Sequence, residues 1–294
     1  MKTSQSRSFR PSIESLEDRV VPTAVLSGGE VYVYGGNARD VVDVNYVSLG
    51  NGNYDVRVVE NGLTTLSVPL TQVTGRVIFY GQGGDDTFRN NTGFRTYAEG
   101  GEGNDTLFGS YSADYLVGGN GADSLVGLGG NDVLTDGGWD LSTNYFWGGY
   151  GDDIVYGGAG GDVIYGEEGM DQLFGFAGND YMDGGYGQDW VFGNEGHDYL
   201  EAGLDYSWNY MDGGDGQDSM YGGYGVDIML GGTGADRLEG RAGNDDLNGG
   251  DDGAFDRLYG GAGYDYFQVE YYGYNGNRDY QNDFGYGGDQ YYNL

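Results

Sequence analysis

The sequence predicts an all-β protein: a parallel solenoid of 18-residue coils with a β-rich N-terminal cap and a C-terminal cap. Three observations predict this fold class. A nine-residue unit, G-G-x-G-x-D-x-U-x with U apolar, recurs across residues 100–268. Glycine accounts for 63 of the 294 residues and proline for only 3. The formal net charge is −34, and such self-repulsion opposes a compact state unless cations are bound.

Each unit predicts one short strand and one turn. Residues 148–156 and 157–165 are two copies that follow each other without a linker. Side chains alternate along the tripeptide x-U-x, so U points to one side. Two units make one coil, and stacked coils give two parallel sheets with the U side chains packed between them. The U positions are Leu107, Leu116, Leu125, Leu134, Val155, Ile164, Leu173, Met182, Val191, Leu200, Met220, Met229, Leu238, Leu247, Leu258 and Phe267, with Phe146 and Met211 in two longer units.

An aspartate stands two residues before the U residue in sixteen units, a regularity that ordinary turn aspartates do not have. One buried side chain in nine residues does not offset the ordering of a glycine-rich chain, so packing alone cannot hold this fold. Stacking brings the aspartates together along two edges, about 4.8 Å apart, where their carboxylates repel. Ca²⁺ resolves that repulsion because it accepts six to eight oxygens in loose geometry, whereas Mg²⁺ demands a tight octahedron and Zn²⁺ prefers His and Cys. The first edge holds Asp105, Asp123, Asp162, Asp180, Asp198, Asp218, Asp236 and Asp256, and the second holds Asp114, Asp132, Asp153, Asp171, Asp189, Asp227, Asp245 and Asp265.

Three intervals between successive aspartates are too long. Intervals 132–153, 198–218 and 245–256 carry three, two and two extra residues. Asn144 and Asn209 stand where the repeat aspartate is expected, one on each edge. Because the pattern resumes in phase each time, these are longer loops and not domain boundaries. Metal occupancy is expected to be highest where the register is unbroken, between residues 153 and 198, and lowest beside the two asparagines.

The segment 24–98 predicts longer strands and a cap, because the end of a solenoid must shield its core and its strand edges. Gly50-Asn51-Gly52-Asn53 and Asn61-Gly62 are turn signals that predict antiparallel hairpins. Residues 35–43 and 81–88 are degenerate copies of the repeat. Strands are expected at 31–34, 41–47, 54–60, 63–68 and 73–80.

Both ends of the chain depart from the repeat. Residues 1–23 form a tail, in which residues 9–19 resemble the L-E-x-R type motif near the N-terminus of large exported proteins of some environmental bacteria. Residues 269–294 are expected to form the C-terminal cap, and 99–268 the repeat domain. The first 23 residues contain no apolar stretch of the kind a secretory signal peptide needs.

Composition excludes several functions. A chain this acidic does not bind nucleic acid unaided, because phosphates are repelled. There is no cysteine, which excludes disulfides and thiolate chemistry, and no apolar run long enough for a transmembrane helix. With one histidine, His197, no Ser-His-Asp set can be assembled, and His197 is expected to be a surface loop residue. Hence no catalytic residue is expected, and the protein is predicted not to be an enzyme.

The repeated unit resembles the RTX (repeats-in-toxin, hemolysin-type) calcium-binding nonapeptide. That resemblance implies a parallel β-roll or β-helix solenoid with several Ca²⁺ ions between consecutive turns on one edge. It also implies that the sixteen aspartates above are the side-chain ligands, together with backbone carbonyls. The segment 279–284 resembles the closing segment of serralysin-type protease β-rolls. Serines 110 and 112 replace glycines, and Glu167, Phe176, Asn194 and Arg241 each replace the second glycine of a unit, so these turns depart from the family pattern.

The hypothesis from the sequence is an exported, calcium-dependent β-roll protein, extracellular or on the cell surface, with a structural or surface-interaction role. One alternative is a module that binds a polysaccharide or a cell-surface protein through aromatic residues in the long loops, such as Trp139 and Trp208. These rings are instead expected to cover disturbed rungs of the roll. Another alternative is a remnant of an RTX enzyme, although about 75 residues of β-pattern before the repeats are too few for the usual catalytic domains.

Overall fold

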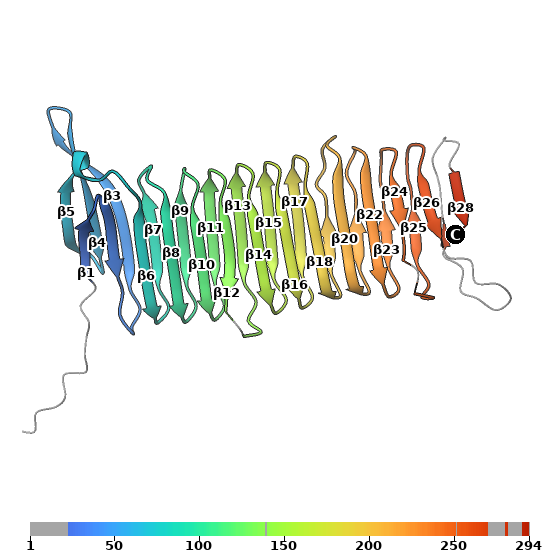
Figure 1. The fold of residues 1–294 in the computed structure, drawn as a ribbon, viewed down its shortest axis with the longest axis horizontal. Helices are drawn as coiled ribbons and strands as arrows, with labels where there is room; N and C mark the ends of the chain where they lie inside the picture. Colours follow the sequence, from blue (N-terminus) through green and yellow to red (C-terminus); the bar gives the residue numbers. More distant parts are fainter. Residues whose placement is uncertain (1–22, 139, 251, 270–279, 282–289, 294) are drawn as a thin grey trace, which may run out of the picture.

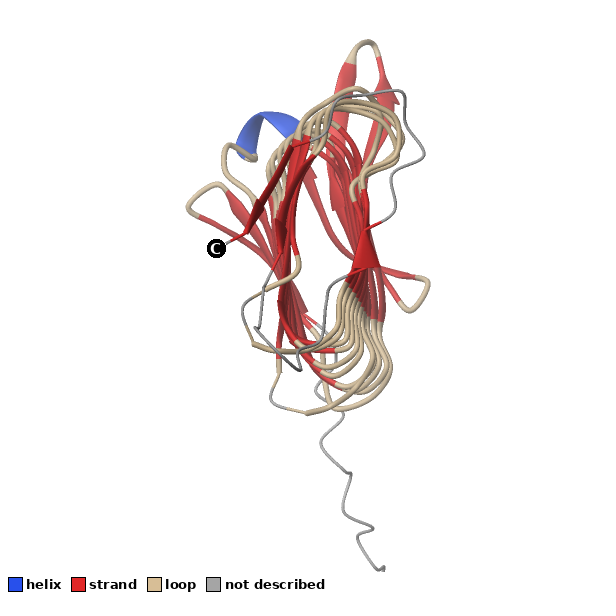
Figure 2. Cartoon of the chain, turned by 90° about the vertical axis from the view of Figure 1, so that its right-hand side faces the viewer, coloured by secondary structure: helices blue, strands red, loops and turns tan. Residues whose placement is uncertain are grey.

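The protein is a long two-sheet solenoid. The computed structural model describes residues 23–138, 140–250, 252–269, 280–281 and 290–293. The strands stack along one axis as a continuous rod (Figure 1), and the view along that axis shows two facing sheets joined by loops at both edges (Figure 2). Each sheet contains 14 strands within the described residues, which make about eleven turns of solenoid. The predicted all-β parallel solenoid is therefore confirmed.

The two sheets take alternate strands of the chain. One 3₁₀-helix, η1 (Leu70–Gln72), follows β5. Sheet A contains β1 (Thr23–Ser27), β2 (Glu30–Tyr34), β6 (Val77–Gly83), β8 (Thr96–Glu102), β10 (Tyr115–Asn120), β12 (Val133–Gly137), β14 (Ile154–Ala159), β16 (Gln172–Ala177), β18 (Trp190–Gly196), β20 (Asn209–Gly216), β22 (Asp227–Thr233), β24 (Asp246–Asn248), β26 (Tyr266–Val269) and β28 (Gln290–Asn293). Sheet B contains β3 (Val41–Gly50), β4 (Asn53–Glu60), β5 (Leu63–Pro69), β7 (Thr87–Asn91), β9 (Thr106–Ser110), β11 (Ser124–Gly129), β13 (Tyr145–Tyr150), β15 (Val163–Glu168), β17 (Tyr181–Tyr186), β19 (Tyr199–Glu201), β21 (Ser219–Tyr221), β23 (Arg237–Glu239), β25 (Arg257–Tyr259) and β27 (Tyr280–Gln281).

The apolar U residues form the core between the sheets. Every one of them has no exposed surface, and up to Leu247 each pairs with the U residue of the next coil in parallel register, as Val155 does with Leu173. The longer loops keep this register, since Leu125 pairs with Phe146 and Val191 with Met211. The predicted positions of the three insertions are therefore confirmed, and the extra residues leave the sheets without displacing the core.

The strands are longer than the tripeptide x-U-x in most of the tract. β14 and β16 each span six residues, and their pairing continues from Val155–Leu173 to Gly158–Phe176. The glycine-rich half of the unit thus stays hydrogen-bonded to the next coil. This leaves only a tight turn at each edge, and the aspartate stands at the end of that turn.

The N-terminal segment continues the solenoid as well as capping it. β2 and β6 pair in parallel, as do β3 and β7, so both sheets run past residue 98 without a break. Among the described strands the antiparallel pairs are β1–β2, β3–β4 and β4–β5, and they lie at the N-terminal ends of the two sheets. The hairpins predicted at Asn51 and Asn61 are confirmed, and both asparagines take the left-handed conformation, with φ of 53° and 49°.

Several expectations fall outside the described residues. These are the tail and its motif at residues 1–22, Trp139, and most of the C-terminal cap including Asp279, Asp283 and Phe284. The two described pieces of that cap, β27 and β28, extend sheets B and A by one parallel strand each.

Candidate metal centre

The repeat aspartates form two continuous hydrogen-bonded ladders. On each edge the carboxylate Oδ1 accepts a hydrogen bond from the backbone N–H of the ladder residue one coil earlier, at 2.5–3.1 Å. Asp153 N–H, for example, donates to Asp171, and Asp171 N–H donates to Asp189. Turns from different coils thereby place their aspartates in the two edge rows expected from the sequence. The side chains are at most 4 % exposed.

The second carboxylate oxygen has no protein partner in most rungs. Oδ2 is buried and accepts no hydrogen bond from the described residues, although a buried carboxylate oxygen without a partner is costly. These oxygens form a row on a chain whose net charge is −34, so the chain as a whole does not balance their negative charge. A cation that prefers oxygen ligands would balance it and would complete a binding site there. The aspartates with an unpaired Oδ2 are Asp86, Asp105, Asp123, Asp132, Asp153, Asp162, Asp171, Asp180, Asp189, Asp198, Asp218, Asp236 and Asp245.

Backbone carbonyls converge on the same places. A Cβ added at Gly148 would lie 2.5 Å from Asp153 Oδ2 and 2.7 Å from the carbonyl oxygen of Gly166 in the next coil. Both oxygens therefore flank one point, and only glycine leaves room for their approach. Further along the turn, a Cβ at Gly169 would collide with the Gly151 carbonyl oxygen of the preceding coil. Each pair of coils thus presents carbonyl oxygens beside the unpaired carboxylate.

Burial makes these carboxyls hard to ionise in the absence of a cation. It is the largest influence at every affected ladder aspartate, and it raises the pKa of Asp123 and Asp171 to about 8 and that of Asp153 to about 7. Neighbouring ladder carboxylates raise the pKa of Asp123 and Asp171 further, whereas the hydrogen bond that each Oδ1 accepts from a backbone N–H lowers it. A bound divalent cation would reverse the balance in favour of the carboxylate.

The donor set fits a hard cation of flexible coordination. Among the described residues no group of three or more His, Cys, Asp or Glu side chains is arranged to hold a metal ion. A cation between coils would therefore take carboxylate oxygens from the ladder and the remainder from backbone carbonyls, as Ca²⁺ does and Zn²⁺ does not. When bound, the ion would supply charge neutralisation and cross-link adjacent turns.

In the two ladder positions that hold asparagine, here called asparagine rungs, the side-chain amide makes its hydrogen bonds within the protein. Asn209 Oδ1 accepts the ladder hydrogen bond from Asp189, and its Nδ2 donates to Asp227 Oδ1 at 2.9 Å. Asn144 behaves likewise, with its Nδ2 donating to Asp136 Oδ1 at 3.0 Å. In both rungs the asparagine Nδ2–H donates to a neighbouring carboxylate. In most aspartate rungs the atom at the corresponding position is an Oδ2 without a partner among the described residues. This is the physical reason to expect weak cation binding beside the asparagine rungs.

The residues that replace glycine in the turns affect the neighbouring aspartate in two different ways. Glu167 and Arg241 take the left-handed conformation of the glycines they replace, with φ of 76° and 69°. Their turns keep an unpaired carboxylate oxygen, at Asp171 and Asp245. Ser110 is not left-handed, and its N–H donates to Asp114 Oδ2 at 2.5 Å, which removes the free oxygen. The glycine at 223 acts on Asp227 in the same way.

Sequence reasoning missed Asp86 and Asp136 as site residues. Asp86 lies in a degenerate repeat, is 1 % exposed, has an unpaired Oδ2 and belongs to the first ladder. Its phase with Phe88 was the signal that identifies it. Asp136 lies near the end of β12, just before the loop with three extra residues, where periodicity gives no guidance, and is buried beside Asn144. The ladder ends at Asp40, where Asn61 Nδ2 donates to Oδ1.

The remaining candidates lie on the outer surface. His197 is exposed, as predicted, and its Nδ1 accepts a hydrogen bond from the N–H of Gln217 at 2.7 Å. Trp208 is 42 % exposed and lies edge-on against Trp190, with ring centroids 5.9 Å apart. Tyr206 is 86 % exposed. No helix in the described part of the chain is long and apolar enough to cross a membrane.

Comparison with known families identifies the class of protein that this ladder defines. The family description "RTX calcium-binding nonapeptide repeat (4 copies)" matches residues 99–134, 142–173, 174–208, 205–238, 221–255 and 252–268, which is more than half of the chain. The chain therefore belongs to the family of RTX calcium-binding nonapeptide repeat proteins, and calcium binding on a β-roll follows from that membership. No curated protein matches the chain.

Proposed function

We propose that this protein is exported and folds on binding Ca²⁺ outside the cell, where the rigid solenoid serves a structural or surface-interaction role. The sixteen aspartates predicted from the sequence are the proposed side-chain ligands, and Asp86 joins them. The observation that supports the proposal most directly is the row of buried, unpaired Oδ2 atoms along both edges. Without cations these atoms oppose folding, and with cations they hold successive coils together.

The proposed export rests on the same dependence of folding on bound cations. A chain whose buried carboxylates lack cations is disfavoured as a folded rod, so at low intracellular calcium it would remain extended enough to pass through an export channel. Extracellular calcium, at about 10⁻³ M, lies in the range of weak oxygen-ligand sites. The proposed location of the folded protein is therefore extracellular or on the cell surface.

Far-ultraviolet circular dichroism across a calcium titration tests the proposal. In chelator we expect little β-signal at neutral pH, followed by a cooperative gain as calcium rises toward about 10⁻⁴–10⁻³ M. Magnesium at the same concentration is the control and should restore much less. An equal β-signal in chelator and in calcium would refute calcium-driven folding.

A second proposed role is a binding module for a polysaccharide or a cell-surface protein. Aromatic rings form columns on the outer faces of both sheets, which favours this role. On sheet B the column runs through Trp147, Tyr165, Tyr181, Tyr199 and Tyr221, with ring centroids 5.1–6.2 Å apart. Such a surface offers stacking area along the rod. A glycan array with the wild type and Trp208→Ala tests the loop version, and no binding by the wild type would end it.

We further propose that the protein is not an enzyme. The support lies in the side chains that the chain carries: one histidine, no cysteine, and buried carboxylates committed to ladder hydrogen bonds. Assays of the purified, calcium-loaded protein against generic peptide, ester and glycoside substrates should give no turnover, and measurable turnover in any of them contradicts the proposal.

A further inference from the structure

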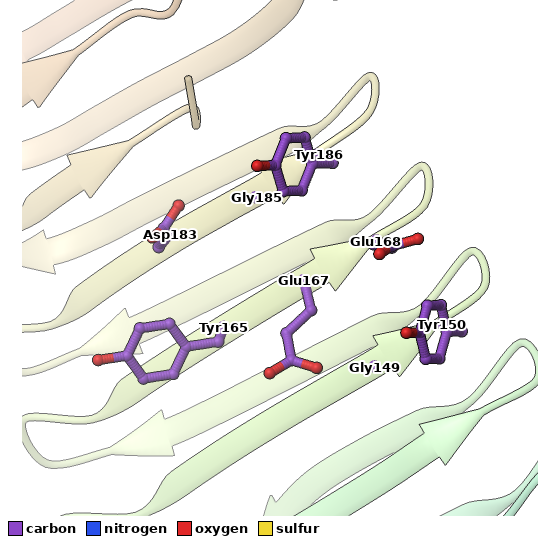
Figure 3. A pocket seen from close by; sticks show the side chains of 8 residues that line it. All are labelled: Gly149, Tyr150, Tyr165, Glu167, Glu168, Asp183, Gly185 and Tyr186. Carbon is purple, nitrogen blue, oxygen red and sulfur yellow. The ribbon is translucent and has the colours of Figure 1, made fainter. Parts of the chain in front are cut away.

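A groove lies on the outer face of sheet B, beside the second aspartate ladder, since Glu167 and Asp183 in its lining raise the pKa of Asp153 and Asp189. It has a volume of about 340 Å³ and spans β13, β15 and β17. Figure 3 shows Glu167 near its centre, with Tyr165 and Asp183 to one side and Tyr150, Glu168 and Tyr186 along the other. The lining therefore combines three carboxylates with three phenol rings and contains no basic residue.

The glycine pattern creates the groove. Glu167 pairs with Gly149 in the preceding coil and with Gly185 in the following one. Neither neighbour has a side chain, so the row that contains Glu167 is hollow on both sides. The parallel row through Tyr150, Glu168 and Tyr186 forms the rim, and both of these tyrosines are more than 60 % exposed. The groove is thus a fixed feature of the sheet surface and involves no mobile loop.

One carboxylate oxygen in this groove lacks a partner. Asp183 Oδ1 is buried and accepts no hydrogen bond from the described residues. Burial raises the pKa of Asp183 and the neighbouring Glu201 carboxylate raises it further, whereas the Gly185 N–H and the charge of Arg241 lower it. A cationic donor at this place would supply the missing hydrogen bond to Oδ1 and additional positive charge.

The same face already binds one cation internally. Arg241 occupies the repeat position of Glu167, and its Nη2 donates to Glu201 Oε1 at 2.7 Å. Its guanidinium carbon lies 5.4 Å from the centroid of the Tyr221 ring. Glu201 and Tyr221 are register neighbours on adjacent strands, so this guanidinium lies against a carboxylate–tyrosine pair. The contact combines a charge-assisted hydrogen bond with a cation–π interaction.

Tyr165 and Asp183 form a similar pair in the opposite order along the rod, with no arginine hydrogen-bonded to Asp183 Oδ1 among the described residues. They are also register neighbours on adjacent strands, and Asp183 in turn pairs with Glu201. The position that corresponds to Arg241, one coil beyond Asp183, is Gly203, which has no side chain, and the groove adds the carboxylate of Glu167. The outer face of sheet B therefore presents two carboxylate–tyrosine pairs, one bound by the chain's own arginine and one whose buried carboxylate oxygen lacks a donor among the described residues.

We propose that this groove binds an arginine side chain of a basic peptide segment on a protein partner, with the guanidinium between Asp183 and Tyr165 and within reach of Glu167. This inference gives the proposed surface-interaction role a place and a ligand class, and it rests on calcium only for the folded solenoid. Arginine fits better than lysine because its planar fork donates to a carboxylate while its face stacks on a ring. The net charge of −34 favours the approach of a basic partner.

Fluorescence anisotropy with the full-length, calcium-saturated protein tests the inference. The probe is a short fluorescein-labelled peptide with two arginines among glycines, and the comparison peptides carry lysine or neutral citrulline instead. Because the whole chain is acidic, the titration is made at about 0.15 M salt, which screens non-specific attraction. We expect the arginine peptide to bind at least five times more tightly than the lysine peptide, with no binding of the citrulline peptide.

The variant Glu167→Gln/Asp183→Asn should weaken arginine-peptide binding at least tenfold. The matched control Glu99→Gln/Asp212→Asn removes two charges beside Tyr97 and Tyr210 on the outer face of sheet A and should change affinity less than twofold. Equal losses in both variants would show that binding is only general electrostatics, and equal affinity for lysine would also overturn the assignment. Circular dichroism of the same samples reports folding separately, so a failure of calcium-driven folding is not confused with a failure of the groove.

Discussion

The ladder contains two kinds of rung, and the contrast between them separates folding from cation binding. At an aspartate rung such as Asp171, Oδ1 accepts the hydrogen bond from the preceding coil and Oδ2 has no partner. At Asn209 the same Oδ1 hydrogen bond is present, but the second atom is an amide nitrogen that donates to Asp227. The hydrogen bond that joins successive coils needs only Oδ1. A cation is needed where the second atom is a carboxylate Oδ2 without a partner.

This contrast also explains why the regular tract and the interrupted tract lie in one continuous rod. The loops at 132–153 and 198–218 add residues, yet Phe146 and Met211 keep their places in the core. An asparagine in such a loop preserves the hydrogen-bond ladder without requiring a cation beside an altered turn. The protein therefore tolerates insertions at the asparagine rungs with no break in either sheet.

The largest loss of folding stability is expected when one aspartate loses both its ladder hydrogen bond and its proposed calcium ligand. Asp171→Ala deletes the Oδ1 acceptor for Asp153 N–H and the proposed ligand oxygen together. Leaving that buried N–H without an acceptor costs about 1–3 kcal/mol, and the loss of calcium stabilisation adds to this cost. Urea unfolding in saturating calcium should show the drop, and Asp171→Asn, which keeps Oδ1, should lose clearly less. Equal losses in the two variants would contradict the division of roles between Oδ1 and Oδ2.

Acid should partly replace calcium. The folded-state pKa of Asp123 and Asp132 is raised to about 8, well above the unfolded value near 4, so the folded state without metal binds more protons. Stability from protonation is therefore fully present below about pH 4 and is lost as the pH rises toward 8. In chelator, lowering the pH from 8 to 5 should increase the β-signal in circular dichroism. In calcium the sign reverses, because protons compete with the cation, and the calcium concentration at the folding midpoint should rise as the pH falls.

Converting an asparagine rung into an aspartate rung should have a smaller effect that depends on calcium. Asn209→Asp replaces the Nδ2 donor to Asp227 with a second carboxylate oxygen, which places like charges in a buried site. We expect about 1–3 kcal/mol of destabilisation at limiting calcium, measured by urea unfolding, and partial recovery in excess calcium. Asn179→Asp, at an exposed turn position whose side chain accepts the N–H of His197, is the control and should change stability little. A loss that calcium does not reduce would indicate that the site cannot accept a cation.

The nine-residue period made the solenoid, the two edge rows and the core predictable from sequence. Leu173 or Met182 needs no tertiary information to be assigned to the core, because alternation in a three-residue strand determines its direction. The aspartate edges follow from the same period. The expected ligands could be named because the turn repeats identically, so that one unit informs all the others.

Features that lie outside the period could not be predicted. Asp86 is in phase, but residues 44–80 separate its unit from the earlier degenerate copy, so the segment suggested a cap and not further coils. Asp136 lies near the end of β12 at a position that the repeat does not mark, and it is buried where Asn144 donates to it. The groove around Glu167 depends on x positions, whose identities vary freely from unit to unit. Their juxtaposition arises only from the register of β13, β15 and β17.

The smallest expected effect concerns where the cation-binding ladder begins. Asp86 lies before residue 99, where the family match starts, yet it has the same buried, unpaired Oδ2 as Asp180. A Cβ at Gly81 would lie 2.5 Å from that Oδ2, and the Gly100 carbonyl oxygen approaches the same point, as in the regular turns. Asp86→Asn should therefore reduce the number of calcium ions bound in isothermal titration calorimetry by about as much as Asp180→Asn does. If only Asp180→Asn lowers the number, the hydrogen-bonded ladder extends further toward the N-terminus than the cation sites do, and the two functions of the aspartate separate along the rod as well as within a rung.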